Sequence, residues 1–133
     1  MKSKKINYNF FGSDAILDHI GIAVKSIETI HTDIISIIDD IQKVKVAFIN
    51  MNGAEIELVE PLSDDSPVSR LLEKGQSFYH LCFRVKNLDE AILTARKNGF
   101  HCIAKPVEAA AFNKKRIAWL FNKIFGLFEL VES

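Results

Sequence analysis

LDHIGIAVKSIETI (residues 17–30) and FYHLCFRVKNLDEA (residues 78–91) carry one pattern of residues twice. His19 of the first stretch aligns with His80 of the second, and apolar residues rich in β-branched and aromatic types follow each histidine. Such runs are typical of β-strands. A repeat of this length is a supersecondary unit, so the sequence predicts two copies of one β-rich module.

A second pair of stretches supports the same division of the chain. GAEIELVEP (53–61) aligns with FGLFELVES (125–133), which places Glu57 on Glu129 and repeats Leu-Val-Glu intact. The two copies therefore differ mainly in the lengths of their loops.

Each copy is predicted to begin with a strand that leads into a short helix. Ser26 and Asn87 are the expected N-caps, and Asn87 has Glu90 three positions on, as a capping box requires. Gly99 is expected to end the second helix. In the first copy, residues 31–42 are too few for a full helix followed by a strand, and their isoleucine pattern does not separate helix from strand.

The remaining expectations concern turns and boundaries. Asn52-Gly53 predicts a hairpin with a type I′ turn. The proline-marked, polar segment before the second copy is expected to be a linker with a short helix at residues 68–74. The expected boundaries are an N-terminal tail at 1–15 and a single domain at 16–133, comprising module one at 16–61, a linker at 62–76 and module two at 77–133.

Composition excludes several classes of partner. The 17 Lys and Arg residues balance the 17 Asp and Glu residues, so no net field favours nucleic acid or an anionic membrane. No apolar run reaches the length of a membrane span, and the first residues lack the pattern of a signal peptide. A cytoplasmic protein is expected. Cys82 and Cys102 do not form a C-x-x-C pair, and we assign them no chemistry.

The four repeated polar residues form the candidate site. Alternation along each strand places His19, Glu57, His80 and Glu129 on the face away from the most hydrophobic row. Buried carboxylates need a cation or a hydrogen-bonding partner, and two carboxylates with two imidazoles would satisfy one divalent metal ion. Nitrogen and oxygen donors without thiolate suit Ni, Co, Mn, Zn or Fe. Taken singly, such a histidine or glutamate is more often an ordinary surface or core residue, and it is the repeat of His with His and Glu with Glu that favours the ligand role.

The motifs LDHIGIAV, IELVEPLSDDSP, YHLCFRV and FELVE resemble the vicinal oxygen chelate superfamily (glyoxalase, bleomycin resistance and dioxygenase proteins), most closely its methylmalonyl-CoA epimerase and glyoxalase I branches. The resemblance implies an α+β fold of two tandem β-α-β-β-β modules, which form a cupped mixed sheet with helices on the outside. It also implies metal ligation by His19, Glu57, His80 and Glu129, and a homodimer.

The resemblance further implies a proton transfer next to a carbonyl group. The metal polarises the carbonyl oxygen of a thioester or hemithioacetal substrate, while a carboxylate removes and returns the proton. Glu129 is the first candidate for that base and Glu57 the second. The activity would be that of a methylmalonyl-CoA epimerase or, alternatively, of a lactoylglutathione lyase. A third hypothesis is a non-catalytic protein that binds a small molecule.

Three features depart from the epimerase pattern. Lys45 stands where some epimerases carry a catalytic glutamate, the segment AAAFNKKRIAW (109–119) lacks the expected glycines, and the first module is short. The basic residues Lys114, Lys115 and Arg116 are candidate substrate-binding residues, with a solvated loop as the alternative. Phe112 and Trp119 could line an acyl pocket or pack in the core.

Overall fold

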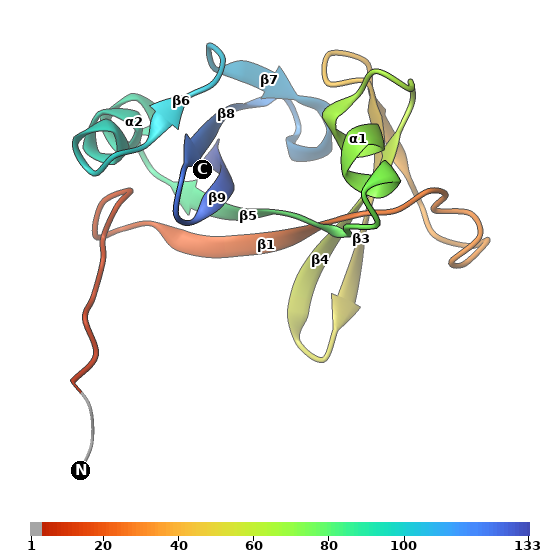
Figure 1. Cartoon of the computed structure of the whole chain (residues 1–133), viewed down its shortest axis with the longest axis horizontal. Helices are drawn as coiled ribbons and strands as arrows, with labels where there is room; N and C mark the ends of the chain where they lie inside the picture. The colour runs from red at the N-terminus through yellow and green to blue at the C-terminus, as the bar shows by residue number, and fades with distance from the viewer. Residues whose placement is uncertain (1–3) are drawn as a thin grey trace.

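A single mixed sheet, curled into a cup, dominates the computed structural model, which describes residues 4–133 (Figure 1). Within these residues the sheet has nine strands, of which eight follow the order β2-β3-β4-β1-β5-β9-β8-β6, and the ninth, β7, pairs with β8. The strands are β1 (Ile16–Ala23), β2 (Ile37–Asp39), β3 (Val44–Met51), β4 (Ala54–Pro61), β5 (Phe78–Val85), β6 (His101–Cys102), β7 (Val107–Ala109), β8 (Lys115–Asn122) and β9 (Gly126–Glu132). The helices are α1 (Pro67–Glu73), α2 (Leu88–Lys97) and the 3₁₀ turn η1 (Ala110–Phe112).

The two predicted modules are the two halves of this sheet. In the first half β1 pairs in parallel with β4, and in the second half β5 pairs in parallel with β9. The antiparallel pairing of β1 with β5 joins the halves into one sheet. The predicted α+β fold with a cupped mixed sheet is confirmed.

Helix α2 forms as predicted and covers the outer face of the second half. The side chain of Asn87 accepts a hydrogen bond from the Glu90 backbone N–H, and Gly99 follows the helix with a φ of 86°. The buried side of α2 packs against the outer face of β5, β8 and β9 through Leu88, Ala91, Ile92 and Ala95. Phe11, in the segment before β1, joins the same core cluster.

The helix predicted after Ser26 is wrong. Residues 24–36 form turns and irregular backbone, in which Ile27 is buried against the outer face of the first half. Thr29 stands three positions after Ser26, where a glutamate would complete a capping box, and its hydroxyl donates to the Ser26 carbonyl at 2.8 Å. The segment is also rich in β-branched residues, which favour a helix less than the straight-chain residues of α2 do.

One contact of the missing helix survives in the first half. The Ile27 backbone N–H donates to Glu60 Oε1 at 2.7 Å, and in the second half the Leu88 N–H donates to Glu132 Oε2 at 3.1 Å. The repeat aligns both pairs. The end of the last strand in each half therefore anchors the segment that follows the first strand, whether or not that segment is helical.

The predicted hairpin turn and the predicted short helix both form. Asn52 and Gly53 both have positive φ, at 51° and 91°, as a type I′ hairpin requires between β3 and β4. Helix α1 lies in the expected linker, and the Ser66 side chain caps it. None of the helices within residues 4–133 is long and apolar enough to cross a membrane.

Candidate metal centre

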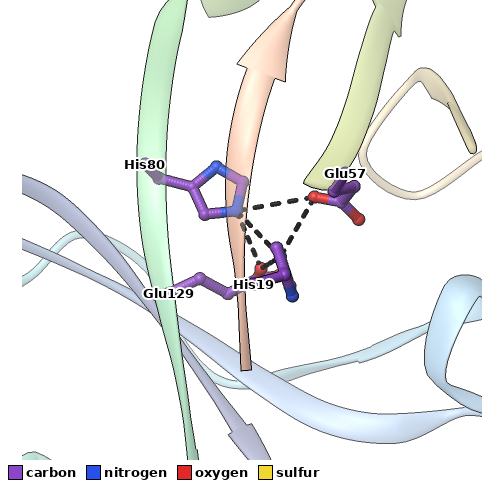
Figure 2. Close-up of side chains that lie close together, drawn as sticks. All are labelled: His19, Glu57, His80 and Glu129. Atoms are coloured by element: carbon purple, nitrogen blue, oxygen red, sulfur yellow. Dashed lines mark hydrogen bonds and ion pairs between the residues drawn. The ribbon is translucent and has the colours of Figure 1, made fainter. Parts of the chain in front are cut away.

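Four polar side chains meet on the inner face of the cup (Figure 2). They project from four neighbouring strands, since β4, β1, β5 and β9 are consecutive in the sheet and supply Glu57, His19, His80 and Glu129 respectively. Their exposed fractions are 5%, 1%, 0% and 3%. The structure thus brings together all four predicted ligand residues in one buried cluster.

The distances within the cluster are those expected of donors around one ion. His19 Nε2 lies 3.3 Å from both Glu57 Oε1 and Glu129 Oε1, and 3.2 Å from His80 Nε2. His80 Nε2 lies 3.5 Å and 3.1 Å from the same two carboxylate oxygens. Donors about 2.1 Å from a common metal stand about 3.0 Å apart at octahedral angles and about 3.4 Å apart at tetrahedral angles.

Hydrogen bonds alone do not satisfy this cluster. Each Nε2 faces two carboxylate oxygens and another Nε2, yet an imidazole nitrogen has one N–H at most. Among the described residues, Glu129 Oε1 is buried without a hydrogen-bond partner, although it points at both histidines. An unsatisfied buried carboxylate oxygen among converging donors fits a divalent cation.

The charges of the cluster depend on one another. Burial raises the pKa of Glu57. It opposes ionisation of Glu129 as well, but the contacts with His19 and His80 outweigh it and lower the pKa of Glu129. Burial opposes protonation of His19, yet the hydrogen bond to Asp18 and the nearby carboxylates raise its pKa. A histidine binds a metal as the neutral imidazole, so a divalent cation at this position would compete with the proton on His19.

Gly21 makes room for one of the histidines. It is the cross-strand neighbour of His80, and a Cβ placed on it would lie 2.2 Å from the imidazole Cε1. The corresponding neighbour of His19 is Cys82, whose thiol has a pKa raised by burial. The glycine of the HIGIAV motif is therefore required by the ring that packs on it.

A cavity of about 270 Å³ opens above the cluster. Glu57, His80 and Glu129 lie in its wall, and the rest of the wall is mostly apolar. The apolar lining includes Val44, Val46, Val59, Val68, Ala109, Phe112, Trp119 and Leu127. An apolar cavity with a few polar groups at one end is the usual form of a small-molecule site.

The chain matches the family model of the Glyoxalase/Bleomycin resistance protein/Dioxygenase superfamily over residues 18–119. The chain belongs to this superfamily. It is 35% identical over 114 residues to Uncharacterized protein YqjC of Bacillus subtilis (strain 168), a match that covers 78% of this chain and 81% of that protein.

Methylmalonyl-CoA epimerases are further relatives of this superfamily member. The ethylmalonyl-CoA/methylmalonyl-CoA epimerase of Cereibacter sphaeroides is 33% identical over 121 residues, which are 83% of this chain and 90% of that protein. A variant of the Streptomyces coelicolor methylmalonyl-CoA epimerase, solved in complex with 2-nitronate-propionyl-CoA, superposes with a TM-score of 0.73 at 25% identity. That match covers 88% of this chain and 96% of the other.

The predicted aromatic residues Phe112 and Trp119 both lie at the site of this glyoxalase-superfamily cup. Phe112 stacks on the imidazole of His19, with ring centroids 5.6 Å apart and an interplanar angle of 22°. Trp119 meets His80 edge-on at 4.8 Å. Both also line the cavity, so each residue serves the site and the core together.

The predicted basic residues lie elsewhere. Arg116 binds Glu132 and Asp89, with its Nη2 3.1 Å and 3.4 Å from their carboxylate oxygens, on the outer face of the sheet. Lys114 and Lys115 are exposed and do not line the cavity. Lys45 also faces outward, where its Nζ is 3.9 Å from Glu60. The structure therefore does not bring these side chains to the ligand cluster.

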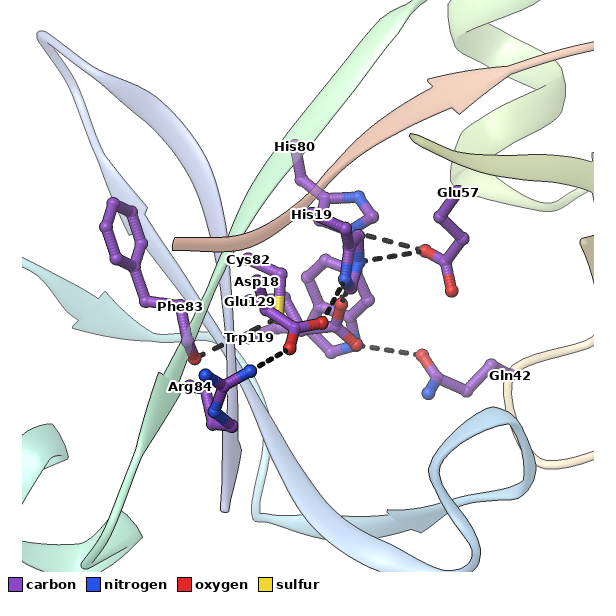
Figure 3. A network of polar contacts seen from close by, with 10 residues as sticks. All are labelled: Asp18, His19, Gln42, Glu57, His80, Cys82, Phe83, Arg84, Trp119 and Glu129. Carbon is purple, nitrogen blue, oxygen red and sulfur yellow. Dashed lines mark hydrogen bonds and ion pairs between the residues drawn. The ribbon is translucent and has the colours of Figure 1, made fainter. Parts of the chain in front are cut away.

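Sequence reasoning missed three polar residues of the site. Asp39 and Gln42 line the cavity, and Gln42 accepts a hydrogen bond of 2.8 Å from the Trp119 indole N–H (Figure 3). Asp18 contacts the outer nitrogen of His19. The first two lie in the ambiguous isoleucine segment, where no pattern marked them, whereas the Asp-His pair at 18–19 was an available signal.

Proposed function

We propose that this chain is a metal-dependent isomerase, similar to methylmalonyl-CoA epimerase, that moves a proton on a carbon next to the carbonyl of an acyl thioester. The observation that carries the proposal is the buried cluster of two histidines and two glutamates at the end of an apolar cavity. The epimerase relatives support the reaction class.

His19, Glu57, His80 and Glu129 would hold one divalent ion, with Ni, Co, Mn and Zn as candidates. When bound, such an ion acts as a Lewis acid on the carbonyl oxygen of the substrate and so acidifies the neighbouring C–H. The chain itself supplies the proton carrier, and Glu129 is the first candidate, with Glu57 second. The two carboxylates reach the site from β9 and β4, in opposite halves of the sheet. Removal of a proton by one and its return by the other would invert the carbon.

The cavity suits the acyl end of such a substrate. Its volume of about 270 Å³ accommodates a short branched acyl group and leaves the remainder of a coenzyme A thioester outside. Phosphates of that remainder need basic partners, and two exposed residues are available for this role, Lys115 at the start of β8 and Lys114 directly before it. The family resemblance also supports a homodimer and a cytoplasmic location.

A lactoylglutathione lyase is the second candidate, and the wall formed by β3 favours it. This strand turns Val44, Val46 and Phe48 toward the site, while Lys45 points outward, so β3 offers no proton carrier to the substrate. The lyase reaction needs one carboxylate to move a proton between adjacent carbons, and a glutamate of the cluster suffices for that.

The first test is elemental analysis after loading with Co²⁺ or Ni²⁺. We expect about one metal ion per chain in the parent and almost none in the His19→Ala, His80→Ala double variant. The matched control is His31→Ala, His101→Ala, which also removes two imidazoles but from exposed positions, and it should keep the metal. Equal, negligible metal in all three proteins would overturn the proposal.

The second test separates the candidate activities on the loaded protein. Exchange of the methine proton of methylmalonyl-CoA in deuterium oxide supports the epimerase, and thioester formation from the methylglyoxal hemithioacetal supports the lyase. Glu129→Gln should lower the active rate by about 10²–10⁴-fold, the usual contribution of a general base. Metal binding with neither activity would support the third hypothesis, a non-catalytic binding protein.

A further inference from the structure

The two central strands each carry an irregularity directly before the ligand histidine. The pairing of β1 with β5 shifts register at two points, and the residues left out there are Asp18 on β1 and Tyr79 on β5. The internal repeat aligns these two residues, so both halves use the same device. A β-bulge re-aims a side chain, and here it turns the residue before each histidine toward the inner face.

The bulged residues of the two strands contact their histidines in different ways. Asp18 Oδ2 lies 2.8 Å from His19 Nδ1, the ring nitrogen that faces away from the cluster. Tyr79 instead packs its ring edge-on against His80 at 4.8 Å, and within residues 4–133 the Nδ1 of His80 has no hydrogen-bond partner. Of the two ring nitrogens that face away from the cluster, that of His19 therefore has a carboxylate partner, and that of His80 has no hydrogen-bond partner among residues 4–133.

Asp18 is itself held in place from the other half of the sheet. Arg84 Nη1 donates to Asp18 Oδ1 at 2.8 Å, so each carboxylate oxygen has its own partner (Figure 3). Arg84 lies on β5, the strand that also supplies His80. The chain of contacts Arg84–Asp18–His19 thus crosses the seam between the two modules.

We propose that Asp18 is a positioning residue for the metal site and that Arg84 orients Asp18. The inference rests on the proposed metal binding. A neutral imidazole carries one N–H, and donation from Nδ1 to Asp18 leaves the lone pair of Nε2 directed at the cluster. Partners of this kind fix the ring and tautomer of a ligand histidine and strengthen it as a donor.

The test measures Zn²⁺ affinity by competition with a chromophoric chelator. Asp18→Ala should weaken binding about 10–100-fold, as expected for the loss of a carboxylate behind a ligand histidine. Asp18→Asn keeps an oxygen acceptor, so its loss should be smaller. Arg84→Gln frees the carboxylate without removing it and should also weaken binding less than Asp18→Ala. The matched control is Asp14→Ala, which removes an exposed charge four residues earlier and should leave affinity unchanged.

A spectroscopic readout distinguishes positioning from a general effect on folding. The Zn²⁺-loaded parent should show a downfield, slowly exchanging proton on His19 Nδ1, and Asp18→Ala should lose it while its circular dichroism spectrum is unchanged. Affinity within twofold of the parent in Asp18→Ala, or an equal loss in Asp14→Ala, overturns the positioning role alone. A parent that takes up no Zn²⁺, Co²⁺ or Ni²⁺ overturns the metal site as well, so the two failures are distinguishable.

Discussion

The two halves of the sheet share an inner face but differ in what covers the outer one. In the second half α2 packs over β5, β8 and β9 and buries its apolar side. In the first half an irregular segment takes that place, and Ile30, Ile35, Ile38 and Ile41 around it are exposed. Both halves nevertheless present one histidine and one glutamate to the cluster. The site therefore depends on the strands and their register, and the outer layer can change without disturbing it.

The largest loss of folding stability should come from a substitution in α2, which covers the outer face of the second half. Leu88, the first residue of α2, is fully buried against the sheet, and Leu88→Ala should destabilise the fold by about 2–5 kcal/mol. Ile34 covers the first half but is only half-buried, and Ile34→Ala should cost about 1 kcal/mol. Urea unfolding of the two variants measures the difference. Equal losses would show that the irregular segment covers its half as tightly as α2 does.

An intermediate loss of stability is expected at the pairing of β1 with β5, where each ligand histidine lies beside a residue of the other half. Gly21→Ala forces a methyl group into the ring of His80, which should cost about 1–3 kcal/mol and displace that ligand. Cys82→Ala, at the equivalent position beside His19, removes a buried thiol without adding bulk and should retain metal. Thermal unfolding and metal content report both. A metal-binding Gly21→Ala variant would contradict the close packing of His80.

The smallest change in stability should come from substitution of Lys45, whose counterpart in the second half is Arg116. Both side chains pair with the last glutamate of their module on the outer face. Lys45→Gln should change stability by less than about 0.5 kcal/mol and leave turnover and metal content unchanged. Arg116→Gln removes contacts with two carboxylates, so it should lower the melting temperature more than Lys45→Gln does. If Arg116→Gln lost turnover but kept its metal, that result would support the predicted contact of Arg116 with substrate.

The inner face was predictable because a duplicated pattern leaves few alternatives. His19 with His80 and Glu57 with Glu129 recur at strand positions, and alternation decides their side of the sheet. Asn87 and Gly99 likewise identified α2 through local backbone chemistry. Strand alternation and helix capping depend on residues close in sequence, the repeat relates the two halves, and the structure agrees with both.

The features that the sequence did not reveal depend on contacts between residues that are far apart in the chain. Glu60, from another strand, binds the Ile27 N–H after Ser26, as Glu132 binds the Leu88 N–H at the start of α2, and no local pattern reports either contact. Asp39 lies in the cavity wall at the end of β2, which pairs with β3 over three residues, and the isoleucine-rich sequence does not reveal this register. The outward direction of Arg116 follows from the register of β8, which the basic cluster alone did not indicate.

The seam between β1 and β5 joins two halves that each supply part of the cluster. Each half contributes one imidazole and one carboxylate, so neither half alone has the four donors of the cluster. Two copies of a single half, related by a twofold axis, would bring together the same set across an isologous interface. In this chain the two aligned halves lie in one polypeptide, where such a dimer would supply them as two separate chains.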